Sequence, residues 1–168
     1  ANNLYEFKSN LNTASKAYLV MDYQKLLAKN NAAKDDIQKK IDTLKNEILN
    51  TAKENQRGMH FEEQNPEYRI FDTNTRTTAI VLQMLTRIDP SHPYIAKIVR
   101  NLLYESQSGT TKSTQEMAVS LISLVEYLKN SKELTPDYNV VIAINNIEKL
   151  NKSYTKDGVN SIDTQTIS

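Results

Sequence analysis

One short apolar pattern occurs twice in this chain, at an offset of 39 residues. Aligning Thr75 with Thr114 also aligns two small residues, Ala79 and Ala118. The same alignment pairs three aliphatic positions: Ile80 with Val119, Leu82 with Leu121, and Leu85 with Leu124. A weaker copy of the pattern lies at Thr13, Ala17, Val20 and Tyr23. A repeat of about 40 residues with two helices per unit is typical of stacked helical hairpins, so the pattern favours a helical array.

Apolar residues at helical spacing predict five helices, over residues 13–29, 34–54, 74–88, 92–105, and 113 to just before Pro136. The first, third and fifth are apolar over a broad face and carry the small alanine of the repeat, which predicts inner positions in the array. The second has one narrow apolar stripe among Lys and Asp residues, which predicts an outer position, and we assign the fourth the same role. Ser113 and Glu116 form a capping box at the start of the fifth helix.

The remaining segments are predicted to be irregular or extended. Residues 57–74 form a long connection, with Gly58 as a helix stop and Pro66 in a turn. Residues 138–145 are β-branched and predict a strand, Asn145-Asn146 is a turn signal, and residues 159–167 are a candidate further strand. The predicted fold class is mainly α: helical hairpins of a partial α/α toroid over residues 1–135, then a short β region over residues 136–168. An open solenoid and an ordinary helical bundle are the alternatives.

The composition argues against several classes of function. Lys and Arg number 21 against 20 Asp and Glu, a formal net charge of +1, and no basic run interleaves with aromatic residues, which argues against nucleic-acid binding. No apolar stretch approaches the ~20 residues of a membrane span, and the opening "ANNLYEF" lacks the pattern of a signal peptide. The chain has no Cys, so thiol chemistry and zinc–thiolate binding are excluded within it. We expect the sequence to be part of a longer protein.

The two histidines lie in different contexts. His60, Glu62 and Glu63 are residue types that bind metals, but a catalytic zinc site needs three converging ligands, and neither HExxH nor a paired-His spacing is present. We therefore expect this stretch to tie down helix ends. His92 lies before Pro93 at a predicted helix start, where helix capping is the expected role.

The acidic clusters also have structural explanations. Asp35-Asp36 resembles a diphosphate–metal site, but both residues lie in the first turn of a predicted helix, where carboxylates favour the helix dipole. Glu62, Glu63 and Glu67 are candidates for the carboxylate pair of a toroidal glycosidase. The chain has no Trp to provide a platform for sugars, so this interpretation is disfavoured.

Two further polar features are assigned no functional role. We expect Arg76 to be a structural hydrogen-bond donor rather than an anion site. Asn151-Lys152-Ser153 matches a glycosylation acceptor, a match that we interpret as accidental. No catalytic, cofactor-binding or metal-binding residue is therefore predicted, and no cofactor.

Three strings occur in order along the chain: "HFEE" (His60–Glu63), "TRTTAIVLQMLTRIDPSHP" (Thr75–Pro93) and "STQEMAVSLISLVEYL" (Ser113–Leu128). Together they resemble the later part of the thioester-containing helical domain of the bacterial alpha-2-macroglobulin family. Members of the family read His-Trp-Glu-Glu, Thr-Arg-Thr-Thr-Ala, Leu-Asp-Pro-x-His-Pro and Ser-Thr-Gln-Glu-x-Ala-x-x-Leu in this order. The likeness covers about residues 13–130, and the predicted strand from residue 138 fits the start of the family's following β domain.

The resemblance implies an α/α toroid, which agrees with the repeat, and a non-enzymatic role in a broad-spectrum endopeptidase inhibitor. Such cell-envelope proteins trap proteases: the protease cuts a bait segment, the molecule rearranges, and an internal Cys–Gln thioester acylates the attacker. Proteases are therefore the implied partners of the full-length protein, and the implied location is the periplasm or cell surface. The Cys-x-Glu-Gln motif and a bait segment are missing from this chain, so we carry over no reactive residue.

Two alternatives stay open: a helical-repeat protein-binding module without an inhibitory role and, less favoured, a toroidal carbohydrate-active enzyme. Five helices are too few to close a toroid. We therefore expect the chain to expose apolar inner-helix surface and to self-associate through it, with no membrane insertion of this segment.

Overall fold

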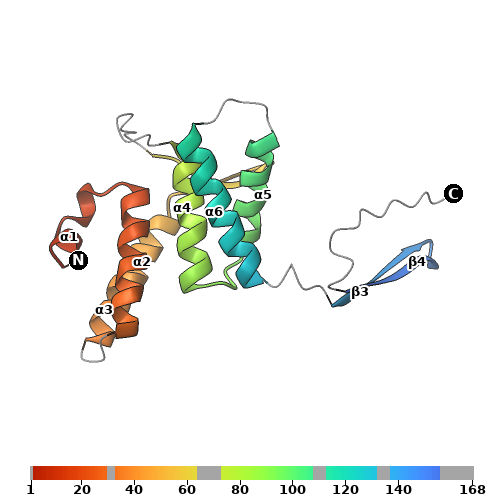
Figure 1. Cartoon of the computed structure of the whole chain (residues 1–168), viewed down its shortest axis with the longest axis horizontal. Helices are drawn as coiled ribbons and strands as arrows, with labels where there is room; N and C mark the ends of the chain where they lie inside the picture. Colours follow the sequence, from red (N-terminus) through yellow and green to blue (C-terminus); the bar gives the residue numbers. More distant parts are fainter. Residues whose placement is uncertain (1, 30–32, 64–72, 108–112, 132–136, 156–168) are drawn as a thin grey trace. The chain divides into compact units, whose positions relative to one another are not determined.

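The computed structural model describes residues 2–29, 33–63, 73–107, 113–131 and 137–155. The chain divides into two compact units, Ala1–Tyr127 and Leu128–Ser168. The described structure is mainly helical with a short C-terminal antiparallel sheet, which confirms the predicted fold class (Figure 1). The elements of the first unit are α1 (Asn2–Glu6), η1 (Lys8–Asn10), α2 (Thr13–Lys29), α3 (Lys34–Leu49), β1 (Ala52–Asn55), β2 (Gly58–Phe61), α4 (Asn74–Ile88), α5 (Tyr94–Gln107) and α6 (Thr114–Ser131), whose last residues belong to the second unit.

The helices of the first unit pair as the repeat predicts. Helix α2 packs against α3, and α4 packs against α5. Helices α2 and α4 also pack against each other, and α6 is hydrogen-bonded to α4, so the three copies of the repeated pattern lie side by side (Figure 1). The predicted boundaries at 13–29 and 74–88 match α2 and α4, while α5 begins and ends two residues later than the predicted 92–105.

The core is concentrated between these helix pairs. Helix α4 is the most enclosed element, with nine buried residues: Thr77, Thr78, Ala79, Ile80, Val81, Leu82, Met84, Leu85 and Thr86. Helix α3 buries the narrow stripe expected of an outer helix, made of Ile37, Ile41, Leu44 and Ile48. Helix α6 differs from the predicted inner helix, because Ser123 is its one buried residue. One face of α6 contacts α4, and the opposite face is exposed.

The predicted helix over residues 34–54 is wrong beyond Leu49. Ala52 lies four residues after Ile48, so the apolar spacing suggested that the helix continues to residue 54. The helix nevertheless ends at Leu49. The Thr51 N–H and hydroxyl both donate to the Ile48 carbonyl, at 3.0 and 2.7 Å. The chain then leaves the helix and enters strand β1.

The predicted irregular connection over residues 57–74 is also wrong in its first part, because it contains strand β2. Strands β1 and β2 form an antiparallel hairpin in which Ala52 faces Phe61 and Asn55 faces Gly58. At the turn, the Arg57 N–H donates to Oδ1 of Asn55 at 2.8 Å, an Asx-type turn that starts the reversal. The hairpin packs β2 against α4 and α5. Pro66 lies outside the described residues.

Gly58 permits the close approach of this hairpin to α5. Its φ is +129°, a conformation that side chains disfavour. A Cβ at this position would lie 2.3 Å from the Lys97 carbonyl oxygen and 3.0 Å from the Asn101 nitrogen. Gly58 is therefore a packing glycine rather than the helix stop that the sequence suggested.

The second unit contains a second hairpin, β3 (Tyr138–Ile144) and β4 (Ile147–Tyr154). The predicted strand over 138–145 matches β3 to within one residue, whereas β4 was not predicted. Asn145 and Asn146 have φ angles of 52° and 61°, so the predicted turn is confirmed as a left-handed, two-residue connection. The candidate strand over 159–167 and the predicted boundary at residue 135 lie outside the described residues.

We expect Gly58→Ala to destabilise the first unit by on the order of 2–3 kcal/mol, because the methyl group collides with backbone atoms and the φ angle is strained. Urea unfolding followed by circular dichroism measures this change. Gln56→Ala in the same exposed turn is the matched control and should change the free energy of unfolding by less than about 0.5 kcal/mol. Equal effects of the two substitutions would contradict the packing role of Gly58.

Candidate functional site

The carboxylate of Glu63 joins the starts of two inner helices. Its oxygens accept hydrogen bonds from the Thr13 and Ala14 backbone N–H groups, at 3.1 and 3.0 Å, at the beginning of α2. The Thr77 hydroxyl of α4 also donates to Glu63, at 2.9 Å. The first N–H groups of a helix have no partner within the helix and lie at its positive end, so a carboxylate satisfies both requirements. The expectation that this stretch ties down helix ends is met by Glu63.

Glu116 makes the corresponding connection between α4 and α6. The predicted capping box is confirmed: the Ser113 N–H donates to Glu116 at 2.8 Å, and the Glu116 N–H donates to the Ser113 hydroxyl at 3.2 Å. The other carboxylate oxygen accepts from the Thr73 hydroxyl at 2.8 Å. Thr73 is itself the N-cap of α4, where its oxygen accepts from the Arg76 N–H at 3.3 Å. We call the hydrogen bonds of Glu63, Thr73 and Glu116 the capping network.

A second contact between α4 and α6 lies farther along both helices. The Arg87 guanidinium donates to both carboxylate oxygens of Glu126, at 2.5 and 2.8 Å, and Gln83 donates to the same carboxylate at 2.9 Å. The hydrogen bond from Arg87 to this carboxylate raises the pKa of Arg87. Two-point Arg–carboxylate pairs fix direction as well as distance, so this contact sets the orientation of α6 on α4.

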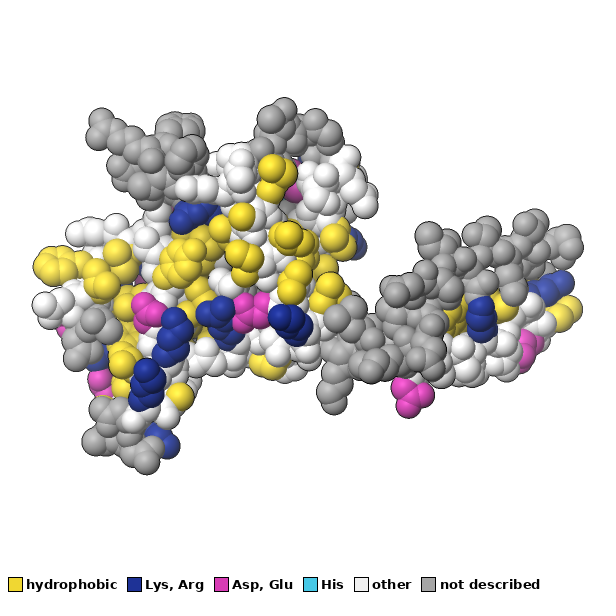
Figure 2. All heavy atoms as spheres, viewed as in Figure 1, with side chains coloured by type: hydrophobic (Ala, Val, Ile, Leu, Met, Phe, Trp, Pro, Cys, Tyr) yellow, Lys and Arg dark blue, Asp and Glu magenta, His cyan; other side chains and the backbone are white. Residues whose placement is uncertain are grey.

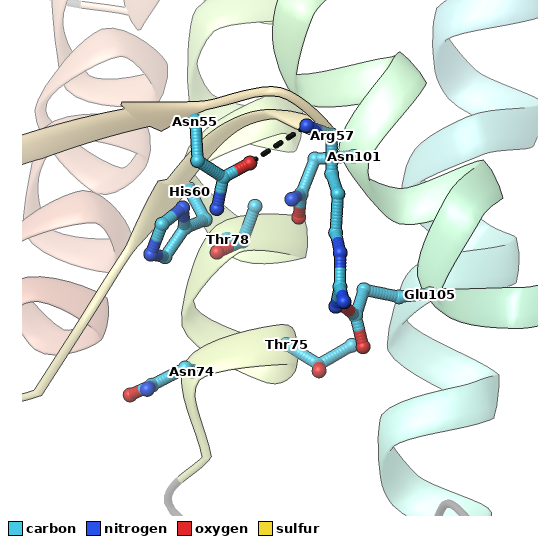
Figure 3. Close-up of a pocket in the computed structure, with 8 residues that line it drawn as sticks. All are labelled: Asn55, Arg57, His60, Asn74, Thr75, Thr78, Asn101 and Glu105. Carbon is cyan, nitrogen blue, oxygen red and sulfur yellow. Dashed lines mark hydrogen bonds and ion pairs between the residues drawn. The ribbon is translucent and has the colours of Figure 1, made fainter. Parts of the chain in front are cut away.

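A polar pocket opens between the β1–β2 hairpin, the start of α4 and the end of α5. It has a volume of about 280 Å³. Every residue that lines it is polar: Asn55, Arg57, His60, Asn74, Thr75, Thr78, Asn101 and Glu105 (Figure 3). In Figure 3, Arg57 and Glu105 lie on one side of the pocket and His60 lies on the other.

Asn101 is the least expected lining residue. It is 5% exposed on the apolar side of α5, beside the buried Ile98 and Leu102. No hydrogen bond joins the side-chain amide of Asn101 to the described part of the chain. Arg57 lies near Asn101 in Figure 3, with its guanidinium carbon 4.7 Å from the centre of the Tyr104 ring and its Nη1 atom 3.5 Å from Glu105. A water molecule or another small polar group would find both donors and acceptors in this pocket.

Two lining residues of the pocket, Thr78 and His60, have structural hydrogen-bond partners. The Thr78 hydroxyl accepts from the Phe61 N–H at 3.0 Å and so holds strand β2 on α4. The His60 ring is paired through Nε2 with Glu62 at 3.1 Å rather than with a hydroxyl of the pocket.

Of the three residues considered as metal ligands, His60 and Glu62 stay together, whereas Glu63 lies apart from them. Glu62 faces the surface, where hydrogen bonds from Lys53 at 2.5 Å and from His60 hold its pKa below the usual value. Glu63 turns the other way, into the capping network. Among the described residues, no three His, Asp or Glu side chains come together as a metal site.

The other acidic candidates do not form a cluster either. Asp35 and Asp36 are exposed in the first turn of α3, and Asp36 pairs with Lys40 of the next turn at 2.6 Å. Glu67, the third carboxylate of the glycosidase interpretation, lies outside the described residues. Asp35 and Asp36 therefore have a local structural role at the start of α3.

Of the remaining residues that the sequence analysis considered, His92 has the predicted position at a helix start. His92 precedes α5, its Nδ1 accepts from the Tyr94 N–H at 3.2 Å, and its carbonyl accepts from the Ile95 N–H. Arg76 is half-buried in the first turn of α4. Asn151 lies in β4, and its amide oxygen accepts from Asn139 of β3 at 2.8 Å.

The sequence interpretation missed the pocket, because Asn55, Arg57, Asn101 and Glu105 were not selected as candidates. One signal was available: Asn101 interrupts the apolar stripe of α5 between Ile98 and Leu102. The other lining residues meet only through tertiary packing, which periodicity does not reveal. No helix in the described part of the chain combines the length and apolar character required to cross a membrane.

Comparison with known proteins identifies no relative: no family model matches the chain, and neither a curated protein nor a solved structure matches it.

We expect Glu63→Ala to cost about 2 kcal/mol of folding stability, because three donors at two helix starts lose their acceptor. Glu63→Gln keeps one acceptor oxygen and should cost less. Urea unfolding measures both variants. Glu62→Ala is the matched control, since its ion pair is on the surface and should contribute less than about 1 kcal/mol. A loss for Glu62→Ala as large as that for Glu63→Ala would contradict the capping network.

Stability should fall when His92 is forced to accept a proton. Burial lowers the pKa of His92 below its usual 6.5, with Asp89 opposing this shift and Lys45 adding to it. The unfolded chain therefore binds the proton more readily, so the stabilisation is complete above about pH 6.5 and declines as the pH falls through the lower folded pKa. His92→Asn keeps a side-chain acceptor at the helix start but does not titrate.

The measurement is the decrease in melting temperature when the pH is lowered from 7.5 to 6.0. This loss should be smaller in His92→Asn than in the unmodified chain, while the two proteins melt at similar temperatures at pH 7.5. An unchanged loss in the variant would exclude His92 as its source.

Proposed function

We propose that this chain is a non-enzymatic scaffold segment of an alpha-2-macroglobulin-like protease trap that acts in the periplasm or at the cell surface. Its helices would support the part of the trap that carries the thioester. The chain itself has no Cys, so its residues do not form the thioester.

The capping network is the observation that carries this proposal. The three strings that resemble the family contribute its main groups: Glu63 from the first, Thr77 from the second, and Ser113 with Glu116 from the third. Thr73, two residues before the second string, completes the connection to Glu116. The polar residues of the strings thus have a shared physical purpose in aligning helix starts, which fits a scaffold better than a set of reacting groups.

The contacts of the carboxylates in these strings support the same proposal. The carboxylates of the resembling strings are engaged by backbone N–H groups, hydroxyls or cations. The polar pocket provides hydrogen-bonding groups, and its His60 ring is paired with Glu62. The carbohydrate-active enzyme therefore gains no support from these residues.

A helical-repeat binding module is the second candidate, and the exposed face of α6 favours it. Large apolar residues of this helix are open to solvent although they occupy positions that the repeat buries in α4. Exposed apolar faces of this kind mark protein interaction sites. The two candidates differ in whether proteases are captured.

The test uses the full-length gene product and proteases of different specificity. A trap should inhibit cleavage of a large protein substrate by at least tenfold, while hydrolysis of a small peptide substrate by the same protease stays nearly unchanged, because an enclosed protease is still reached by small molecules. Equal inhibition of both substrates would indicate active-site inhibition, and no inhibition of either would favour the binding module.

A companion variant connects the function to this segment. Glu63→Ala in the full-length protein should lower the melting temperature of the trap and the fraction of protease captured. Glu62→Ala should leave both unchanged, since its ion pair lies on the surface. Capture that is insensitive to Glu63→Ala despite a lowered melting temperature would contradict a supporting role for the capping network.

A further inference from the structure

The polar pocket contains a buried amide that has no hydrogen-bond partner in the described part of the chain. Asn101 is only 5% exposed, and it lines the pocket from α5. In Figure 3 its amide points away from α5, toward Asn55 and Thr78. Buried polar groups without partners lower the stability of a fold, so nearly all of them are hydrogen-bonded in native proteins. An amide of this kind, aimed into a pocket, indicates that a further group binds there.

His60 brings a second group without a partner to the same pocket. Its Nε2 atom is paired with Glu62, but its Nδ1 atom is buried and has no hydrogen-bond partner among the residues that the structure describes. His60 lies on strand β2 and Asn101 lies on α5, so two separate elements contribute such groups to one lining.

The lining and the size of the pocket favour a small polar ligand. Figure 2 shows apolar side chains gathered on the surface over α6, whereas none of the eight residues that line the pocket is apolar. The volume of about 280 Å³ lies near the lower end of the usual range for small-molecule sites, roughly 300–1,000 Å³. A molecule of amino-acid size therefore suits the pocket better than a segment of a folded partner.

The charges of the pocket favour a ligand with both a positive and a negative group. Arg57 and Glu105 form an ion pair at 3.5 Å, and their side chains are 53% and 24% exposed. A long, partly exposed ion pair contributes little to stability, so it can be exchanged for contacts with a ligand. A zwitterion provides a carboxylate for Arg57 and an ammonium group for Glu105. A ligand with a single charge would leave one of these two residues without a partner.

The spacing along α5 defines the other end of the ligand. Asn101 and Glu105 are four residues apart, so their side chains lie on the same face of the helix, about 6 Å apart along its axis. A primary carboxamide has N–H donors and a carbonyl acceptor side by side, and it can therefore form two hydrogen bonds with the Asn101 amide. In glutamine, two methylene groups separate such a carboxamide from the charged groups of the α-carbon.

We propose that this pocket binds a free amino acid whose side chain ends in a carboxamide, which is the chemistry of glutamine and asparagine. The carboxamide pairs with Asn101, the α-carboxylate with Arg57 and the α-ammonium group with Glu105. The proposal concerns binding by the 168-residue chain itself and does not depend on the protease-trap role.

The first test is titration calorimetry of the purified 168-residue chain with L-glutamine and L-asparagine. At least one of them should bind with a dissociation constant below about 1 mM. L-Glutamate should bind roughly tenfold more weakly or worse, because its carboxylate offers no donor to Asn101 and adds a charge. N-acetyl-L-glutamine should be weakened similarly, because it lacks the ammonium group for Glu105. Binding of neither amide, or equal binding of L-glutamate, would overturn the proposal.

The second test replaces the buried amide by an apolar group of the same shape. Asn101→Leu keeps the number and branching of side-chain heavy atoms, and it should weaken binding roughly tenfold or more. The melting temperature of the free variant should be equal to or above that of the unmodified chain, because an unpartnered buried amide is removed. Asn46→Leu makes the same change at an exposed position of α3 and should leave the dissociation constant within about twofold.

A third variant keeps the proposal testable if Asn101→Leu does not fold. Arg57→Gln removes the guanidinium from an exposed position of the hairpin turn, and it should also weaken binding roughly tenfold. Undiminished binding in a folded Asn101→Leu or Arg57→Gln variant would overturn the assignment to this pocket. A raised melting temperature of Asn101→Leu, together with no binding of either amide to the unmodified chain, would show that the pocket holds water alone.

Discussion

Carboxylates at the beginnings of helices hold the first unit together at one end. The first N–H groups of a helix must find acceptors outside the helix, and in this chain Glu63 provides an acceptor for α2 from 49 residues away. The same carboxylate accepts from α4, and Glu116 links α4 to α6. Each hydrogen bond is individually modest. Together they require three helices that are distant in sequence to begin at a common level.

The β1–β2 hairpin makes this alignment possible. It follows α3 directly, packs β2 on α4 and α5, and ends two residues before Glu63. Gly58 lets the turn lie against the α5 backbone, and the Phe61 backbone is held by the Thr78 hydroxyl. The Glu63 carboxylate therefore reaches the start of α2 from just beyond a strand whose position is set by two other helices.

Features encoded by neighbouring residues could be predicted from the sequence, and features encoded by distant residues could not. The spacing of apolar residues located α2 and α4, and Ser113 with Glu116 identified the capping box because its partners are three residues apart. The hairpin was missed because Ala52 continues the four-residue apolar spacing from Ile48. This spacing does not reveal that the hydrogen bond from Thr51 to Ile48 ends the helix earlier. A tie to helix ends was expected near Glu63, but its partners Thr13 and Thr77 were not identifiable. The pocket could not be predicted either, because Asn101 and Arg57 are distant in the sequence and come together only in the folded chain.

The attachment of α6 to α4 has a consequence for local unfolding. Helix α6 buries one residue, Ser123, and is held to α4 by the side chains of Glu116 and Glu126, whereas α4 buries nine residues. Opening of α6 therefore breaks these polar bonds and the core contacts of the partly buried Val119, Leu124 and Tyr127, but it exposes no fully buried aliphatic side chain. Amide protons of α6 should exchange with solvent deuterium long before those of α4, and the outermost helix of the row is then a separate cooperative unit that opens while the rest stays folded.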